Sequence, residues 1–425
     1  MKKVTTFTID NFTSFRLKML NWCGQFNIFC LLDNNEYNFD KPAFECLLAV
    51  GCKATLQANA GDAFAALKKF SAAHQDWLFG HLGYDLKNEI SPLQSSNFDG
   101  IGFTDMHFFV PEIVLQLNKQ TLTVYCEENA EQVFKAIQCS EEFKEIIAAG
   151  VTILNRFTEA EYVHIVQKLQ QHILRGDCYE VNFCQEFFST GAVIDPATVY
   201  QKLMQLSPSP FAALYKSNEQ YCICASPERY FKKMSNKVLS QPIKGTSKRY
   251  LTDEDLDEKS RQQLLNSEKE RTENVMVVDL VRNDLSKVCK QGTVQVEELF
   301  GIYSFPQVHQ MISTISGTLE DGLDWTDAVK ATFPMGSMTG VPKLRVMQLI
   351  EQYEQTKRGL FSGAIGYVDP AGNCDFNVVI RSIMYNAASR YLSFQTGSAI
   401  TFYSNAAMEY EECLLKAGAM KKVLQ

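Results

Sequence analysis

Short apolar runs that end in turn-forming residues recur along the 425-residue sequence and limit the folds open to it. Runs at 211–216 and 220–225 flank Ser-Asn-Glu, a pattern typical of a β-hairpin. Runs at 108–117 and 122–126 flank Asn-Lys-Gln and predict a second hairpin. Further strands are expected at 26–32, 307–319, 363–368, 378–385 and 391–403.

Helical periodicity occurs between these groups of strands. Thr158 and Glu161 fit a capping box, and Tyr162, Val166 and Leu169 follow at helical spacing. Other helices are expected at 130–149, 267–284, 325–332, 342–353 and 408–423. Groups of strands with helices between them, and many hairpins, predict an α+β fold whose sheets are mainly antiparallel.

Composition excludes several classes of protein. A hydrophobic content of 46% and a charged content of 21% are those of a globular protein. The net charge of -8 argues against a nucleic-acid binder, which needs a basic excess. The 13 cysteines are odd in number and contain no Cys-x-x-Cys, which favours reduced thiols. We therefore expect a cytoplasmic protein without a signal peptide or a membrane span.

The chain is expected to have two parts, an N-terminal subdomain at 1–149 and a functional region at 150–425.

Two pairs of glutamates, each spaced by three residues, lie in predicted helices. Glu270 and Glu273 form one pair, and Glu409 and Glu412 form the other. This spacing places both carboxylates of a pair on one helix face. Two such faces opposite each other would offer Mg²⁺ the oxygen ligands that it prefers. The alternative for each pair is a solvated helix face.

Lys244 lies in a turn between Pro-Ile and Gly-Thr, shortly after Glu228. A lysine that loses its proton is a nucleophile, and a buried glutamate that keeps its proton is a general acid. The alternative is a solvated surface lysine.

The Gly/Ser/Thr-rich loop at 333–343 leads into a helix that begins at Pro342. The free backbone N–H groups at this helix start favour binding of an anion. The alternative is an ordinary helix start that binds no ligand.

Arg381 lies in a predicted strand that is otherwise apolar on one face. An arginine in such a place either pairs bidentately with a substrate carboxylate or forms a structural salt bridge. His309 and Tyr367 are further polar or aromatic candidates in this half of the chain.

The ordered set of these segments resembles the chorismate-utilising enzymes, from about residue 158 to the C-terminus. The segments that carry the resemblance are Ser-Pro-Glu-Arg at 226–229, Pro-Ile-Lys-Gly-Thr at 242–246, Glu-Arg-Thr-Glu-Asn at 270–274, His309, the loop at 333–343, Ile-Arg-Ser at 380–382 and Glu-Tyr-Glu-Glu at 409–412. The resemblance implies a large α/β sandwich of two mainly antiparallel sheets with helices on the outside. It also implies Mg²⁺ as cofactor, with Glu273 and Glu412 as direct ligands and Glu270 and Glu409 as the outer pair.

The resemblance further implies roles for single residues. Glu228 matches the general acid and Lys244 the covalent nucleophile. The residues that match substrate-binding positions are Thr246, His309, Ser337, Tyr367, Arg381 and Gly397.

Within the family, lysine at position 244 is typical of the aminodeoxychorismate synthases, and alanine is typical of anthranilate and isochorismate synthases. The implied reaction is amination of chorismate at C4 for p-aminobenzoate and folate synthesis, with ammonia from a separate glutamine amidotransferase. Glu180 departs from the pattern, because ammonia-using members usually have glutamine there and water-using members have lysine. The alternatives are anthranilate synthase component I and, further off, an isochorismate or salicylate synthase or a non-catalytic chorismate-binding subunit.

Overall fold

The computed structural model describes residues 2–37, 44–127, 129–146, 150–305 and 308–425, which form two large β-sheets. Sheet A has 12 strands, in the order β1 (Lys3–Thr8), β8 (Thr121–Cys126), β7 (Ile113–Leu117), β3 (Cys46–Val50), β2 (Ile28–Asp33), β11 (Phe211–Ser217), β12 (Gln220–Ser226), β21 (Ser382–Asn386), β22 (Tyr391–Ile400), β10 (Glu180–Ser189) and β18 (Gly340–Val341), with β9 (Leu154–Asn155) on β10.

Sheet B has 10 strands, in the order β15 (Ile243–Lys248), β17 (Val308–Thr318), β14 (Lys237–Gln241), β13 (Arg229–Met234), β20 (Cys374–Asn377), β19 (Ala364–Val368), β5 (Leu78–Leu82), β6 (Met106–Val110) and β4 (Ala54–Ala58), with β16 (Gln295–Ser304) on β17. Every pairing between these strands is antiparallel. The predicted α+β class with two mainly antiparallel sheets is confirmed.

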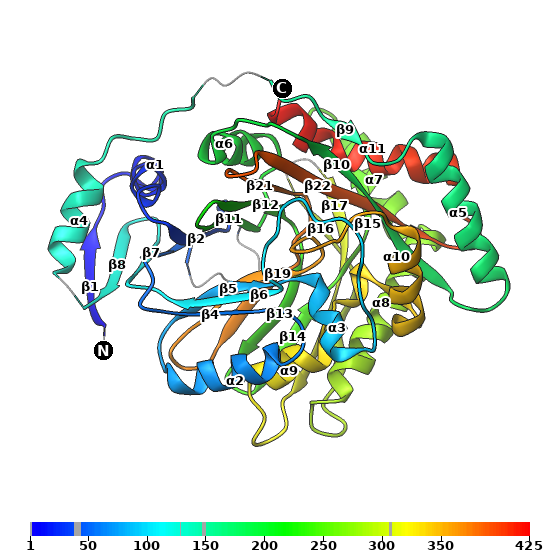
Figure 1. Ribbon diagram of the computed structural model, residues 1–425, viewed down its shortest axis with the longest axis horizontal. Helices are drawn as coiled ribbons and strands as arrows, with labels where there is room; N and C mark the ends of the chain where they lie inside the picture. The colour runs from blue at the N-terminus through cyan, green and yellow to red at the C-terminus, as the bar shows by residue number, and fades with distance from the viewer. Residues whose placement is uncertain (1, 38–43, 128, 147–149, 306–307) are drawn as a thin grey trace.

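Helices cover the outer faces of both sheets (Figure 1). In that view α6 and α11 lie above the strands of sheet A, α2 and α9 lie below sheet B, and α5 and α8 lie at the right. The described helices are α1 (Phe12–Cys23), α2 (Ala63–Ala73), α3 (Lys87–Ile90), α4 (Ala130–Cys139), α5 (Glu159–Leu174), α6 (Pro196–Leu206), α7 (Glu254–Leu265), α8 (Glu268–Ser286), α9 (Trp325–Thr332), α10 (Lys343–Tyr353) and α11 (Ala406–Val423), with short 3₁₀ turns η1 (Tyr84–Leu86) and η2 (Gly336–Met338). None of the described helices is both long and apolar enough to cross a membrane.

The inner faces of the two sheets pack on each other. Tyr215 of β11 places its hydroxyl 3.2 Å from Nδ1 of His81 and 2.5 Å from Nδ1 of His107, which lie on β5 and β6 of the other sheet. On β12, Cys222 and Cys224 belong to this inner core, while Ile223 packs into a second cluster with the outer helices. Because successive side chains of a strand point to opposite faces, β12 contributes residues both to the core between the sheets and to the core under the outer helices. None of the 13 cysteines, all of which lie in the described part of the chain, forms a disulfide, as their number and spacing predict.

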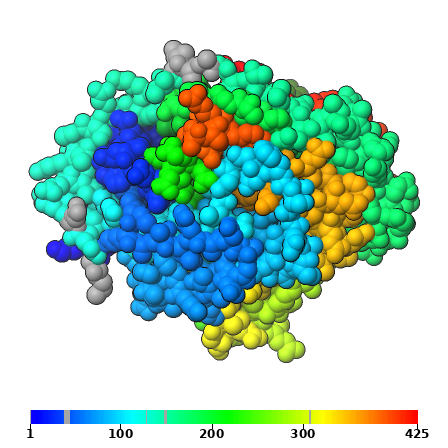
Figure 2. Space-filling view, in the orientation of Figure 1, coloured from blue at the N-terminus to red at the C-terminus, as the bar shows by residue number. Residues whose placement is uncertain are grey.

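The N-terminal third is built into both sheets. β2, β3, β7 and β8 extend sheet A, and β4, β5 and β6 extend sheet B. The space-filling view shows the corresponding blue and cyan surface in contact with green and orange segments from later in the chain (Figure 2). Residues 147–149, at the predicted boundary between 1–149 and 150–425, lie outside the described residues, and that boundary stays a prediction.

The structure confirms some predicted local features and changes the limits of others. The capping box of Thr158 and Glu161 is confirmed at the start of α5. The single strand expected at 108–117 is wrong, because Pro111 separates β6 in sheet B from β7 in sheet A. The helix expected at 130–149 ends at Cys139, and the strand expected at 378–385 begins only at Ser382. Gln307, the start of the expected run at 307–319, lies outside the described residues.

A pair of glycines joins the N-terminal and C-terminal parts of sheet B. Gly80 of β5 and Gly366 of β19 are direct cross-strand neighbours. A Cβ atom at Gly366 would lie 2.1 Å from the carbonyl oxygen of Asp375. Close by, the Phe108 and Phe376 rings from the flanking strands have centroids 6.1 Å apart. Glycine is therefore required for this close approach.

We expect Gly366→Ala to lower the free energy of unfolding by about 1–3 kcal/mol, because the added methyl group has no room. The midpoint of urea unfolding measures this change. Gly418→Ala is the control, because a Cβ atom there meets nothing within 4 Å in α11. That variant should be neutral or stabilising by up to ~1 kcal/mol. Equal midpoints for the two variants would contradict the close packing.

Candidate active site

Lys244 lies at a bulge in β15, the edge strand of sheet B. Ile243 pairs with Ile312 and Thr246 pairs with Gln310, with a register shift between the two pairs. Gly245 within the bulge has φ +96°, a conformation that favours glycine, and a Cβ atom there would lie 3.0 Å from Oε2 of Glu270. A bulge re-aims the side chains beside it. Here it brings the 244–246 segment against α8.

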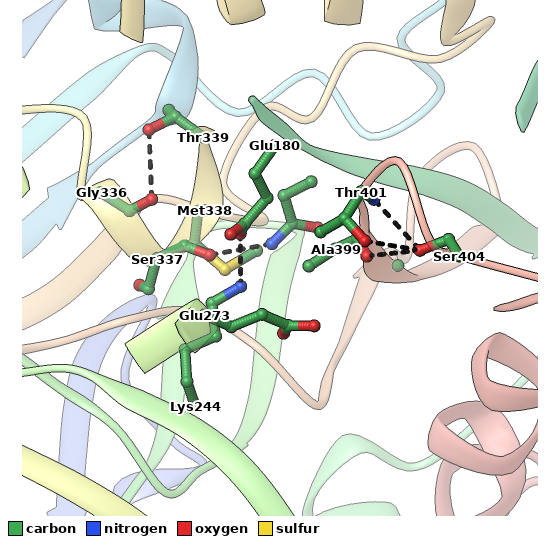
Figure 3. Close-up of polar contacts among 12 residues, drawn as sticks. Glu180, Lys244, Glu273, Gly336, Ser337, Met338, Thr339, Ala399, Thr401 and Ser404 are labelled. Carbon is green, nitrogen blue, oxygen red and sulfur yellow. Dashed lines mark hydrogen bonds and ion pairs between the residues drawn. The ribbon is translucent and has the colours of Figure 1, made fainter. Parts of the chain in front are cut away.

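The partner of Lys244 is Glu180, the first residue of β10 in sheet A. Nζ of Lys244 lies 2.8 Å from Oε1 of Glu180 (Figure 3). The two side chains are only 11% and 4% exposed, so the ion pair is buried. The site therefore depends on residues from both sheets. A buried glutamate at the start of a largely apolar strand requires a compensating cation, but the sequence does not indicate which residue supplies it.

The charges around Lys244 keep its side chain protonated. Burial disfavours the ammonium form, but Glu180, Glu273 and Glu228 outweigh burial and raise the pKa of Lys244 above its ordinary value. In Figure 3, Glu273 and Ser337 lie on either side of Lys244. An amine in this charged form has no free lone pair, so Lys244 would act as a nucleophile only after losing a proton.

Glu228 lies between β12 and β13 and is 4% exposed. Its own N–H donates to Ser226 Oγ, and its carbonyl oxygen accepts from Val378 N–H. Burial raises the pKa of the Glu228 carboxyl to about 7, although nearby Ser337 and Lys244 act in the opposite direction. A carboxyl with this pKa is protonated in a large fraction of molecules near neutral pH, as a general acid requires.

Ser337 is held beside Glu228 by the loop that leads into α10. Asn182 Nδ2 donates to the carbonyl oxygen of Ser337 at 2.8 Å. Arg358 fixes the same loop, because its guanidinium donates to the carbonyl oxygens of Met338 at 2.6 Å and Asn182 at 2.8 Å. Lys343, at the start of α10, pairs with Asp284. Sequence analysis missed Asn182 and Arg358, since both act through backbone oxygens of residues distant in the chain.

The glutamate pair of α8, Glu270 and Glu273, lies opposite the pair of α11, Glu409 and Glu412. Lys269 lies between them, with Nζ 3.9 Å from Oε1 of Glu273 and 3.8 Å from Oε1 of Glu409. Glu412 pairs with Lys416 at 2.7 Å. The structure therefore brings together the four predicted carboxylates, including Glu270. Among the described residues no three potential metal ligands converge into a ready ion site.

The carboxylates of this cluster differ in their protonation. Burial raises the pKa of Glu273 to about 7, opposed by Lys244 and supported by the negative charges of Glu180 and Glu270. Burial also raises the pKa of Glu270. The pKa of Glu412 is lowered, because Lys416 outweighs burial. Oε1 of Glu273 is buried without a hydrogen-bond partner among the described residues.

Arg381 lies in a loop just before β21, where a strand residue was expected. Its φ of +51° places it in the left-handed region, which a strand interior does not allow. Burial lowers the pKa of its guanidinium, and no carboxylate of the described residues forms an ion pair with it. The alternative of a structural salt bridge therefore finds no support, and the desolvated guanidinium is suited to an incoming anion.

Two of the predicted substrate-binding residues lie apart from Lys244. Tyr367 of β19 lines a cavity of about 200 Å³ with Asp33, Asn34 and Arg229. His309 of β17 turns toward α7, with Nε2 3.2 Å from Oδ1 of Asp257. Adjacent strand residues point to opposite faces, so neighbouring Gln310 faces the other way. Oε1 of Gln310 is buried and has no hydrogen-bond partner among the described residues, a feature that the sequence did not reveal.

Thr246 and Gly397 lie at the margins of the site. Thr246 is opposite Gln310 in the register of β15 and β17. Gly397 of β22 pairs with Cys184 of β10, and its carbonyl oxygen accepts from Lys416 at 2.9 Å. Because Lys416 also pairs with Glu412, Gly397 is connected to the glutamate cluster.

Known proteins share this arrangement of sheets and helices. The model of the chorismate binding enzyme family matches residues 28–422. An anthranilate synthase component I-like protein of Synechocystis sp. is 34% identical over 83% of this chain and 73% of its own length. Aminodeoxychorismate synthase component 1 of Bacillus subtilis is 32% identical over 83% of this chain and 77% of its own.

A solved structure of a related enzyme has the same fold as this chain. The crystal structure of anthranilate synthase component I from Streptococcus pneumoniae matches with a TM-score of 0.78 and 27% identity, over 88% of this chain and 91% of that one. The expected sandwich architecture is thereby confirmed. With a family match that spans nearly the whole sequence, the chain belongs to the chorismate binding enzymes.

Proposed function

We propose that this enzyme is an aminodeoxychorismate synthase component I, which converts chorismate and ammonia to 4-amino-4-deoxychorismate. The observation that carries the proposal is the buried lysine, Lys244, next to a carboxyl group, Glu228, whose pKa is raised to about 7. A nucleophile and a proton donor in one pocket suit displacement of a hydroxyl group. The resemblance to aminodeoxychorismate synthase component 1 of Bacillus subtilis supports the same function.

In the first half of the reaction, the Lys244 amine forms a bond to C2 of chorismate. Both conjugated double bonds of the ring shift, the bond from C4 to its hydroxyl breaks, and Glu228 gives that hydroxyl a proton so that it leaves as water. In the second half, ammonia forms a bond to C4, both double bonds shift back, and the bond from C2 to Lys244 breaks. Two displacements with good leaving groups replace one difficult step. The desolvated guanidinium of Arg381 is suited to hold a substrate carboxylate meanwhile.

We further propose Mg²⁺ as cofactor, held by Glu273 and Glu412 with Glu270 and Glu409 as the outer pair. The donor set fits, because carboxylate oxygens are the ligands Mg²⁺ prefers and Oε1 of Glu273 is buried without a hydrogen-bond partner among the described residues. When bound, the ion supplies positive charge to a substrate carboxylate. Lys269 and Lys416 form ion pairs with this negative cluster in the structure, and a bound ion would compete with them for the carboxylates.

The ammonia source that we propose is a separate glutamine amidotransferase subunit, in the cytoplasm. A second candidate function is anthranilate synthase component I, which the similarity to the Streptococcus pneumoniae enzyme favours. Lys244 argues against it, because amination at C2 requires no lysine that itself attacks C2.

The product formed from chorismate, Mg²⁺ and ammonium salt tests the proposal. We expect an aminated product that retains its enolpyruvyl group, identified by mass spectrometry, and loss of kcat by about 10²–10⁴-fold in Lys244→Ala. Lys248→Ala, at the exposed end of the same strand, is the control and should keep wild-type rates. Fluorescent anthranilate as the product, or wild-type rates in Lys244→Ala, would overturn the proposal.

The pH dependence tests the role of Glu228. Because the raised pKa of about 7 belongs to the free enzyme, the acid form of Glu228 is present below pH 7 and lost above it. We expect kcat/KM for chorismate to fall about tenfold per pH unit above this value, at saturating Mg²⁺ and constant free ammonia. Glu228→Gln should lose both this limb and most of the activity. A flat profile from pH 6 to 9 would exclude Glu228 as the acid.

Metal titration tests the glutamate cluster. Removal of Lys269 relieves competition for Glu273 and Glu409, so Lys269→Met should lower the half-saturating Mn²⁺ concentration about two- to fivefold. Glu409→Gln should raise it about 10–100-fold. Electron paramagnetic resonance of Mn²⁺ measures binding directly. Lys290→Met is the control, since Lys290 pairs with Asp321. Unchanged binding in both test variants would place the metal elsewhere.

A further inference from the structure

Lys244 has one ion-pair partner among the described residues, and that partner is Glu180. Oε1 of Glu180 accepts from Nζ at 2.8 Å. The second oxygen, Oε2, is buried and has no hydrogen-bond partner in the described part of the chain. Glu180 as a whole residue is 3% exposed. A buried carboxylate that uses only half of its acceptor capacity has an oxygen left over for a proton.

The proposed function requires Lys244 to lose a proton before it attacks. Five carboxyl groups interact electrostatically with Lys244. They are Glu180 from β10, Glu228 from the β12–β13 connection, and Glu270, Glu273 and Glu412 of the candidate metal cluster. Glu228 must itself be protonated to act as the acid, so it cannot receive this proton. Glu273 lies beyond ion-pair distance of Nζ and is a candidate metal ligand. Of these carboxyl groups, all in the described part of the chain, Glu180 is the one that forms an ion pair with the reacting nitrogen.

We propose that Glu180 is the catalytic base for Lys244, a role that rests on the proposed function. The proton moves from Nζ to the Glu180 carboxylate, which yields a neutral amine and a neutral carboxylic acid. Oε2 then holds the proton away from Nζ, which leaves the lone pair of the amine free. The amine bonds to C2, Glu228 protonates the departing C4 hydroxyl, and water is released.

The protons balance in the second half as well. Ammonia bonds to C4 and the bond from C2 to Nζ breaks, so that Lys244 leaves as a neutral amine. Glu180 returns its proton to this amine and restores the ion pair. The new ammonium group at C4 gives one proton to Glu228. Every enzyme group is thereby back in its starting state.

Chemical rescue tests the role of Glu180. We expect Glu180→Ala to lower kcat by about 10²–10⁴-fold, and formate to restore part of the rate in proportion to its concentration, because the small carboxylate fills the vacated space. Glu180→Gln should be equally slow without rescue, because its amide fills that space. Below pH 7, where Glu228 is still protonated, its kcat should rise about tenfold per pH unit, since solvent must then remove the Lys244 proton, whereas the wild type lacks this rise. Glu297→Ala, at an ion pair with Lys237, is the control and should keep wild-type rates with and without formate.

The outcomes separate the two proposals. If the wild type aminates chorismate at C4 and Glu180→Gln matches its rate within about threefold, the base is not Glu180, while the proposed function stands. Slow variants with neither formate rescue nor the pH-dependent rise would mean a structural ion pair and would also overturn the proposal. A wild type that fails to aminate C4 overturns both. Glu180→Gln keeps the shape of the side chain, so its result holds even if Glu180→Ala does not fold.

Discussion

The ion pair between Lys244 and Glu180 is the interaction on which the site depends. It joins an edge strand of sheet B to a strand of sheet A, so the distance between the two charges is fixed by the packing of the whole sandwich. Burial of two charges costs several kcal/mol per ion, and only close geometry offsets that cost. Loss of one partner would leave the other as an unpaired buried charge. The pair therefore keeps Lys244 charged and in place, and the proposed reaction requires that this charge be removed first.

Opposite charges are balanced throughout the surroundings of this pair. Glu228 and Glu273 both have pKa values raised to about 7, chiefly by burial, and both feel the charge of Lys244. Lys269 and Lys416 neutralise the carboxylates that face each other across α8 and α11. The same negative cluster that suits a divalent cation also keeps Lys244 protonated. Any process that changes one of these charges changes the protonation of the others.

The parts of the site that the sequence predicted are those set by local spacing. Glu270 and Glu273 share a helix face because they are three residues apart, and the turn at Lys244 contains the glycine that its bulge requires. What sequence failed to predict depends on long-range packing. The contact of Glu180 with Lys244 joins two sheets, Arg381 adopts a left-handed conformation, and Tyr367 faces a separate cavity. The strand break at Pro111 was readable from the proline, but the change of sheet there was not.

The most direct test of the account is the mass of the intact protein after mixing with chorismate and Mg²⁺ in the absence of ammonia. Without the second nucleophile, the lysine adduct has no ammonia to displace it and should accumulate. We predict a mass gain equal to chorismate less one water, located on the peptide that contains Lys244 and absent from Lys244→Ala. An unmodified wild-type protein that nevertheless aminates chorismate at C4 would contradict covalent catalysis by Lys244.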